Sequence, residues 1–208
     1  MRESTPNASH GAHWSRRAWL SALMTAPWAV HSQTPAPAEV SSALPGLRLL
    51  GGGRLTFFAL HIYDARLWVD AAFHAPRFAD APLALELEYA RSLQGELIAQ
   101  RSLKEMRRTG DIGTPQADAW LAAMTRLFPD VAKGDRLTAV HQPGQALRFF
   151  FNGKLQGRID DAEFAQRFIA IWLAPQTSEP QLRQALLGER GSSPCVTRPP
   201  PPPTRLQC

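Results

Sequence analysis

Residues 136–159 read RLTAVHQPGQALRFFFNGKLQGRI. Two turn signals, Pro143-Gly144 and Asn152-Gly153, divide this stretch into three runs rich in apolar and β-branched residues. Asn-Gly between two such runs is the strongest short-range signal for a two-residue β-hairpin. The stretch therefore predicts a meander of three antiparallel strands, at residues 136–141, 146–151 and 154–159.

Periodicity on either side of the meander predicts the other elements. Leu83, Leu85, Leu87 and Tyr89 alternate with smaller or charged residues, which indicates a strand with one face in the core and one in solvent. Apolar residues at helical spacing predict four helices, at residues 92–108, 114–128, 160–173 and 178–188. Asp160 and Ser178 are the expected N-caps of the last two, and Gly188 the expected end of the chain's final helix.

A long apolar stretch lies before these elements. Gly51-Gly52-Gly53 separates residues 47–50 from residues 55–69, and we expect the glycines to mark a break or a bulge in a strand. Strands, two helices, strands and two helices then follow one another. This order indicates an α+β protein, an antiparallel sheet covered by helices, and not a repeated βαβ unit.

Composition separates the middle of the chain from its ends. Ten of the 18 prolines lie outside residues 39–188, and that segment carries 17 Lys and Arg against 16 Asp and Glu. Four of the five net positive charges therefore come from the ends of the chain. A basic charge balance of this kind does not indicate a nucleic-acid-binding surface on the folded part.

Residues 1–38 have the features of an export signal. Arg16-Arg17 precedes an aromatic residue, a leucine and a modestly apolar run that ends at Val30, which resembles a twin-arginine signal. The run is too short to span a bilayer. Ala36-Pro37-Ala38 offers small residues for cleavage, with a site near Ser32 as the alternative. We expect a periplasmic protein; the alternative is a cytosolic leader with a misassigned start codon.

Residues 191–208 form the other unusual end. Five consecutive prolines, 199–203, favour polyproline II and cannot join a core, so we expect a disordered proline-rich tail. Both cysteines, Cys195 and Cys208, lie in this tail, and no cysteine chemistry is expected in the folded part. Residues 39–190 are therefore the predicted single domain.

Short motifs within that domain resemble, in the same order, those of the bacterial branch of the chalcone isomerase-like family. They are GGGR at 51–54, HIYDARLW at 61–68, FPDV at 128–131, GDRL at 134–137, FNGK at 151–154, IWL at 171–173 and LLG at 186–188. The resemblance implies an open-faced sandwich, in which helices cover a large antiparallel sheet and a ligand cleft lies between the two layers.

The plant enzymes of this family close a flavanone ring. The active site that this resemblance implies has an arginine near the glycine turn, a threonine on the next strand, and a tyrosine and an asparagine on the following helix. Such groups would stabilise the phenolate and the developing enolate. Arg54 matches the arginine, but Ala59 falls at the threonine's place, and residues 92–108 contain neither tyrosine nor asparagine. We therefore assign no catalytic residue, and keep an isomerase or intramolecular lyase with substituted active-site residues as the alternative.

Other relatives bind fatty acids without transforming them, which needs only a cation at the end of an apolar cavity. The resemblance implies Arg54 for that cation, Tyr63 and Tyr89 as hydroxyl partners, and Arg91 and Arg101 as further cations. Each has a structural interpretation too: Tyr89 shares the face of core leucines, and Arg101 is placed to pair with Glu105 four residues on.

We therefore predict an exported binder of a small lipophilic or fatty-acid-like ligand, with Arg54 at the mouth of an apolar cavity. A third alternative is an interaction module whose sheet face binds a protein partner. No cofactor and no metal are expected, because His61, His74 and His141 form no i,i+4 pair and the glycine run lacks the lysine of a phosphate loop.

Overall fold

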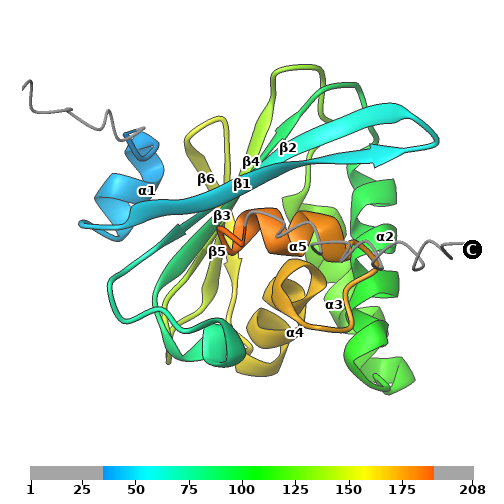
Figure 1. The fold of residues 1–208 in the computed structure, drawn as a ribbon. Coiled ribbons are helices and arrows are strands. Elements are labelled where there is room, and N and C mark those ends of the chain that lie inside the picture. The colour runs from blue at the N-terminus through cyan, green and yellow to red at the C-terminus, as the bar shows by residue number, and fades with distance from the viewer. Residues whose placement is uncertain (1–34, 190–208) are drawn as a thin grey trace, which may run out of the picture. The chain divides into compact units, whose positions relative to one another are not determined.

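The computed structural model describes residues 35–189; the expected export signal up to residue 34 and the expected tail lie outside the described residues. A six-stranded antiparallel sheet forms its centre, and the strands lie side by side in chain order (Figure 1). The strands are β1 Arg48–Phe57, β2 Leu60–Val69, β3 Leu83–Tyr89, β4 Arg136–His141, β5 Leu147–Phe151 and β6 Lys154–Ile159. The expected meander is β4–β5–β6.

The helices form two unequal layers. They are α1 Ala38–Ala43, α2 Gly95–Met106, α3 Thr114–Leu127, α4 Ala162–Leu173 and α5 Pro180–Leu186, with short 3₁₀ turns at Ala75–Asp80 and Arg107–Thr109. α2 to α5 share one apolar core with one face of the sheet, and α1 packs on the opposite face (Figure 1). The expected α+β sandwich is confirmed. None of the described helices has the length and apolarity to cross a bilayer.

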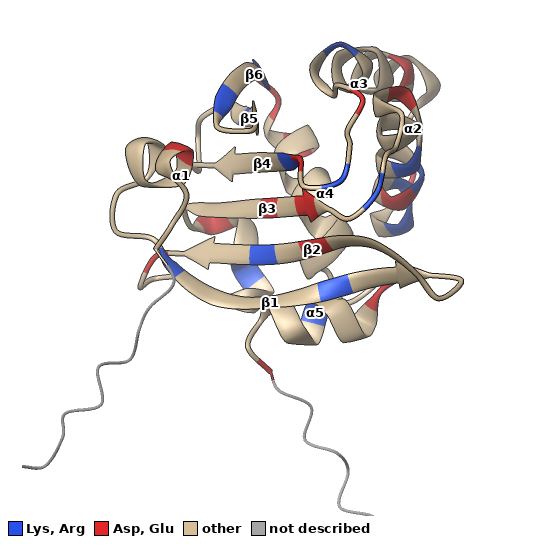
Figure 2. Ribbon diagram, turned by 90° about the horizontal axis from the view of Figure 1, so that it is seen from above, with Lys and Arg blue, Asp and Glu red and all other residues tan. Residues whose placement is uncertain are grey.

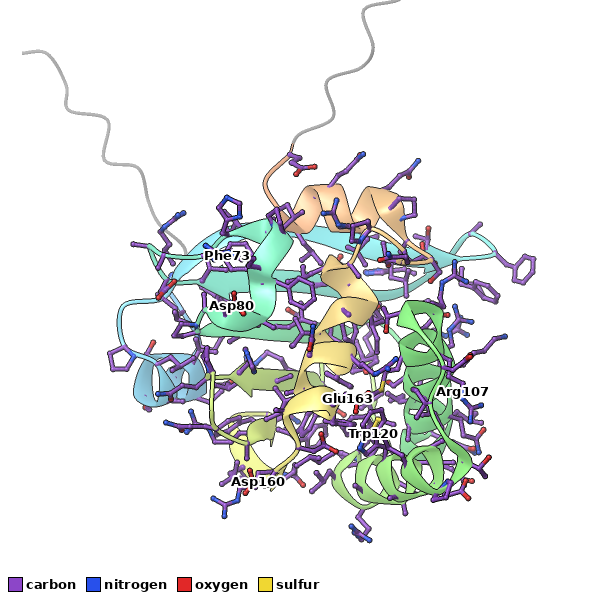
Figure 3. All side chains as sticks on the ribbon, turned by 90° about the horizontal axis from the view of Figure 1, so that it is seen from below. Phe73, Asp80, Arg107, Trp120, Asp160 and Glu163 are labelled. Atoms are coloured by element: carbon purple, nitrogen blue, oxygen red, sulfur yellow. The ribbon has the colours of Figure 1, made fainter. Side chains whose placement is uncertain are left out.

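Aromatic side chains fill the core beneath the helices. Phe149 of β5 lies with its ring centre 5.2 Å from that of Phe168 on α4 and 5.1 Å from that of Phe128. Trp120 of α3 packs against Phe164, where α3 meets α4, and donates its indole N–H to Asp161 (Figure 3). Edge-to-face contacts of this kind add to the stabilisation that β5, α3 and α4 gain from burying apolar area.

The sheet face that α1 covers is more buried than the alternation of apolar and polar residues in β3 predicts. Ala84 of β3 packs against α1, and the carboxylate of Glu86 accepts hydrogen bonds from Arg66 at 2.8 Å and from the Trp68 indole at 2.9 Å. Both β3 residues are buried, so the prediction of a solvent-facing side is wrong for them and holds only for Glu88, whose side chain is 44% exposed. An alternating sequence shows which residues are polar, but not whether they are exposed. A carboxylate that is buried and hydrogen-bonded gives the same alternation as an exposed one.

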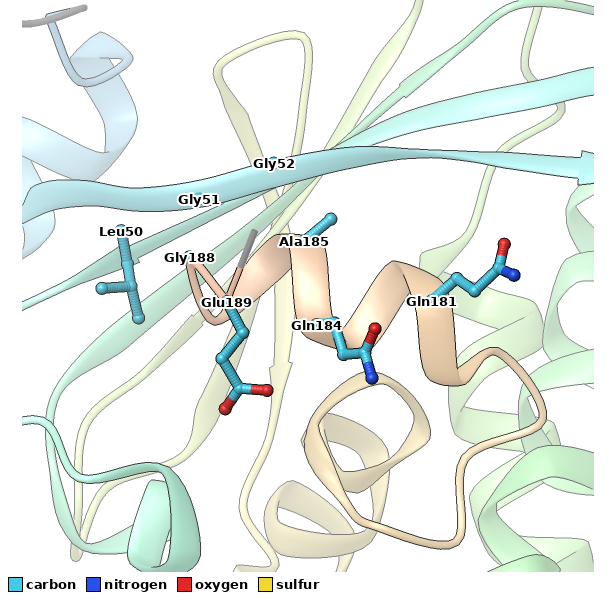
Figure 4. A pocket seen from close by; sticks show the side chains of 8 residues that line it. All are labelled: Leu50, Gly51, Gly52, Gln181, Gln184, Ala185, Gly188 and Glu189. Atoms are coloured by element: carbon cyan, nitrogen blue, oxygen red, sulfur yellow. The ribbon is translucent and has the colours of Figure 1, made fainter. Parts of the chain in front are cut away.

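The glycine run does not interrupt β1. Gly51, Gly52 and Gly53 all pair with β2, and the predicted irregularity is a bulge between Leu49 and Gly51. Gly51 is required instead by α5, which approaches the strand so closely that a Cβ on this residue would collide with the carbonyl oxygen of Ala185 (Figure 4). The predicted bulge is confirmed and the predicted break is wrong.

Helix boundaries differ from the predicted ones by up to three residues. Asp161, rather than Asp160, caps α4 by accepting a hydrogen bond from the Phe164 N–H at 2.9 Å. Glu179, rather than Ser178, occupies the N-cap position of α5. α2 begins at Gly95 and not at residue 92, because Leu93 first forms a β-bridge with Val131. Differences of one or two residues at helix ends are common, so these shifts leave the predicted helices in place.

Candidate functional site

An apolar cavity of about 230 Å³ lies between the β1–β2–β3 end of the sheet and the helices above it. Its walls come from β1, β2, β3, α2 and α4 and from the residue before α5. The lining residues are Leu55, Ile62, Tyr63, Tyr89, Leu93, Leu97, Ile98, Arg101, Ser102, Glu105, Ile171 and Glu179. Apolar walls with a few polar groups at one side are typical of a small-molecule site.

A bulge in β2 shapes the floor of this cavity. Leu55 pairs with Tyr63 and Thr56 pairs with His61, so Ile62 is an extra residue in the ladder. In a regular strand two successive side chains point to opposite faces. The bulge allows Ile62 and Tyr63 both to line the cavity, which re-aims one side chain in the way β-bulges commonly do.

Tyr63 and Tyr89 are cross-strand partners, with ring centres 5.9 Å apart in an edge-to-face arrangement. The Tyr63 oxygen accepts a hydrogen bond from the Trp172 indole at 3.0 Å, and no described residue accepts the proton of either tyrosine. Burial raises the pKa of Tyr63 and of Tyr89 well above the ordinary value, so both hydroxyls stay protonated at neutral pH. The cavity therefore presents two hydrogen-bond donors to a ligand.

Charged side chains lie at the α2 side of the cavity. Arg101 pairs with the buried Glu105 at 2.8 Å, as its i,i+4 spacing predicts, and Glu179 lines the wall before α5. One Glu105 oxygen accepts no hydrogen bond from any described residue, although the Arg108 guanidinium lies 3.7 Å away. Arg101 is positive and the two glutamates are negative, so the charged residues of the lining have a small net negative charge.

Arg54 lies on the other face of the sheet. Leu55 points into the cavity, so Arg54, its neighbour on the same strand, points away from it. Its side chain is 60% exposed, and its guanidinium donates a hydrogen bond to Asp64 at 3.0 Å. Although partial burial alone would raise the pKa of Asp64, the hydrogen bond from Arg54 and the nearby His61 hold it below its usual value. The expectation that Arg54 lies at the cavity mouth is wrong.

The structure thus brings together three of the five predicted residues. Tyr63, Tyr89 and Arg101 line one cavity, whereas Arg54 and Arg91 are not among its lining residues. Sequence reasoning missed two carboxylates of the site. Glu105 was recognised only as an ion-pair partner, and Glu179 carries no local signal because the fold brings it to the cavity from a distant segment.

A larger groove, of about 500 Å³, lies between β1 and α5 (Figure 4). Glycines, Gln181, Gln184 and Glu189 form most of its lining, and its described lining residues include neither a cation nor an aromatic ring. Its shape follows from the close approach of α5 to the glycine strand. The smaller apolar cavity, with its converging donors, is therefore the better candidate site.

Comparison with known proteins agrees with this architecture. A protein of Haemophilus influenzae described as uncharacterized is 28% identical over 144 residues, which are 69% of each chain. The crystal structure of a fatty-acid binding protein from Arabidopsis thaliana matches with a TM-score of 0.56 at 16% identity, covering 69% of this chain and 88% of that one. The second likeness shows a shared fold. The sequence pattern that defines the chalcone isomerase-like proteins matches residues 31–188, so this chain belongs to the chalcone isomerase-like family.

Proposed function

We propose that this protein binds a small lipophilic molecule in the cavity beneath α2, without transforming it. The observation that carries the proposal is the convergence of Tyr63, Tyr89 and Arg101 on a cavity with otherwise mostly apolar walls. The name of the Arabidopsis thaliana structure, a fatty-acid binding protein of the same fold, supports this class of ligand.

The size of the cavity favours a short ligand. Its volume of about 230 Å³ is below the ~300–1,000 Å³ of ordinary ligand pockets. Leucine and isoleucine side chains surround the apolar part, so a medium-length alkyl chain fits better than a long one. A long chain would extend past the exposed Leu97 into solvent and gain nothing from its outer part.

Arg101 is the group that would bind a carboxylate head. It already pairs with Glu105, so an incoming carboxylate has to share or replace that partner. The hydroxyls of Tyr63 and Tyr89 would donate to the same head, and charge-assisted hydrogen bonds of this type are about twice as strong as neutral ones. Head-group recognition therefore depends on Arg101, and retention of the chain depends on the apolar walls.

The test is calorimetric titration with octanoic, dodecanoic and hexadecanoic acids and their methyl esters. We expect octanoic or dodecanoic acid to bind more tightly than hexadecanoic acid. Joint replacement Arg101→Gln and Glu105→Gln, which leaves no unpaired buried charge, is expected to weaken binding of the acid about ten-fold, because a hydrogen bond to a charged group contributes ~1.5–3 kcal/mol. Binding of the ester should change less.

Lys104→Gln is the matched control, because Lys104 is an exposed cation on the same helix that does not line the cavity. It should leave the affinity for the acid unchanged. The proposal is wrong if neither acids nor esters bind at micromolar concentration. The role given to Arg101 is wrong if the paired glutamine variant binds the acid as tightly as Lys104→Gln does.

An isomerase remains the second candidate, because two protonated hydroxyls facing an apolar cavity are suited to stabilise an enolate. Its guanidinium would be that of Arg101, since Arg54 lies on the other face. Following the absorbance of a chalcone substrate tests this candidate. Turnover that is lost in Tyr89→Phe, a variant that keeps the ring, would favour it over the binder.

We also propose export to the periplasm, with processing before residue 36. The carbonyl of Pro37 accepts hydrogen bonds from the Val40 and Ser41 N–H groups at 3.0 and 2.9 Å, and Ala36 packs beside α1. Cleavage after Ala38 would remove both, whereas cleavage near Ser32 would keep them. The intact mass of protein recovered from a periplasmic fraction distinguishes the two sites. A chain that begins at Glu39 would contradict this prediction.

A further inference from the structure

The turn between β1 and β2 exposes large apolar side chains. Phe57 is 51% exposed, Phe58 84% and Leu60 51%, and the two phenylalanine rings contact only each other among aromatic groups of the described chain. We call residues 57–60 the hairpin tip. Apolar residues exposed singly are ordinary, but three around one turn form a patch that the folding of the domain does not explain.

The backbone of the tip is also unfavourable for its residues. Phe58 and Ala59 have φ values of 47° and 61°, a left-handed conformation that costs most residues with a Cβ. The β5–β6 turn has the same two-residue form, with φ values of 47° and 82°, and uses Asn152 and Gly153, which suit it. Phe58 and Ala59 are residues that this turn type disfavours, and their exposure brings no gain in packing. Such an unfavourable choice of residues points to a function.

The tip adjoins the apolar cavity. The β1–β2 hairpin extends past the other strands, over the end of the sheet where α2 lies (Figure 1). Leu55 and Ile62, two residues from either side of the tip, line the cavity. Leu97 at the start of α2 lines it too, and is exposed. An apolar path therefore runs from the tip to the interior.

Cations line the exposed side of α2 beyond Leu97. Arg101 and Lys104 follow Leu97 at helical spacing on α2, where Figure 2 shows the basic positions in blue. Arg107 and Arg108 are exposed in the 3₁₀ turn that follows α2 (Figure 3 labels Arg107). Glu96 is the one exposed acidic residue between positions 95 and 108. Apolar side chains next to a cationic helix face are the combination that binds an anionic lipid surface.

We propose that the hairpin tip inserts into the surface of an anionic phospholipid bilayer, with the cationic side of α2 against the headgroups. The mouth of the cavity then faces the lipid. A protein partner is a poorer match, because a stable protein interface buries ~800 Å² on each side and needs a complementary surface, whereas a bilayer accepts a narrow apolar tip without one. This inference does not depend on what the cavity binds.

The test uses the full chain and sedimentation with vesicles of phosphatidylcholine alone, or of phosphatidylcholine mixed with phosphatidylglycerol. The variant is Phe58→Asn with Ala59→Gly, which removes the exposed ring and supplies favoured turn residues. We expect its partition onto anionic vesicles to fall at least about ten-fold, because burying one phenylalanine is worth more than a ten-fold change in an equilibrium constant. Its midpoint of chemical unfolding should rise, which separates lost binding from lost folding.

Leu155→Ser is the matched control, since Leu155 is an exposed apolar residue on β6, away from the tip. It should sediment with vesicles like the unaltered protein. Lys104→Gln with Arg108→Gln should reduce binding to anionic vesicles and leave binding to neutral ones unchanged.

The proposal is overturned if the unaltered protein binds neither kind of vesicle, or if the Asn-Gly variant binds as well as the unaltered protein. It is also overturned if the variant merely converts a dimer into a monomer in size-exclusion chromatography, because the tip would then be a contact between two copies. No cavity ligand is present in these assays, so their failure leaves the fatty-acid titrations unaffected.

Discussion

Gly51→Ala is expected to lower the free energy of unfolding by about 3 kcal/mol, the upper end of the range for overpacked sites. The new Cβ would collide with the Ala185 oxygen and would lie 2.7 Å from the Leu186 oxygen and 2.9 Å from the Gly188 nitrogen. All three are backbone atoms, which cannot rotate away. α5 would have to move off β1, and the buried side chain of Leu186 would lose its packing. Equilibrium unfolding in urea, followed by tryptophan fluorescence, measures the loss.

The neighbouring glycine provides the control. Gly52 lies on the same strand but points to the other face, where a Cβ would lie 3.0 Å from the Ala65 oxygen and otherwise contact only Arg66. Alanine is favoured over glycine within a strand by ~0.5–1 kcal/mol, which offsets that one close contact. Gly52→Ala should therefore change stability by less than about 1 kcal/mol. Equal losses in the two variants would show that α5 does not require the glycine at position 51.

Glu39→Ala is expected to cost about 2 kcal/mol, in the range for lost hydrogen bonds to a charged group, because the Arg136 that remains is partly exposed to water. The Glu39 carboxylate is 1% exposed and accepts hydrogen bonds from Arg136 at 2.9 and 3.1 Å and from the Thr138 hydroxyl at 3.1 Å. Its removal leaves the Arg136 guanidinium with Glu86 at 3.8 Å as its remaining ion pair among described residues. The short helix α1 would lose its polar anchor to β4.

Two further variants separate the charge from the helix. Ser41→Ala removes only an exposed hydrogen bond from α1 and should change stability by less than ~0.5 kcal/mol. Combining Glu39→Ala with Arg136→Met removes both partners, and the double-mutant cycle then reports their coupling. If Glu39→Ala is no more destabilising than Ser41→Ala, the ion pair does not hold α1 on the sheet. Amide exchange at Val40 provides an independent readout, because it should quicken when α1 detaches.

Elements defined by local chemistry were predictable from the sequence. The β4–β5–β6 meander follows from Asn152-Gly153 and from the apolar runs around it, and α3 follows from apolar residues at helical spacing. The β1–β2 hairpin was not predicted, because Phe58 and Ala59 are not turn residues and their positive φ values leave no trace in composition. Turns with positive φ values usually contain Asn or Gly. The presence of Phe58 and Ala59 at this turn is also one of the observations behind the proposed membrane contact.

The candidate site was predicted in part. Tyr89 shares the face of Leu85 and Leu87, so its inward orientation follows from the period of a strand. Arg54 was predicted to lie on the wrong face of the sheet. The face on which it lies depends on the β1–β2 register, which two bulges shift. A shift of one residue exchanges the two faces of a strand, and a bulge supplies such a shift without a sequence signal.

The amino-acid sequence by itself determined the class of this protein. Its turns and the periodicity of its apolar residues require an antiparallel sheet with helices, and its ordered motifs place it among chalcone isomerase-like chains. Only the tertiary structure decided that Arg101 and Glu179 meet the two tyrosines in one cavity, and that α5 rests on Gly51. A local sequence pattern carries information about only a few neighbouring residues. These contacts join segments that lie far apart in the chain, and the packing of the whole core determines which segments come together.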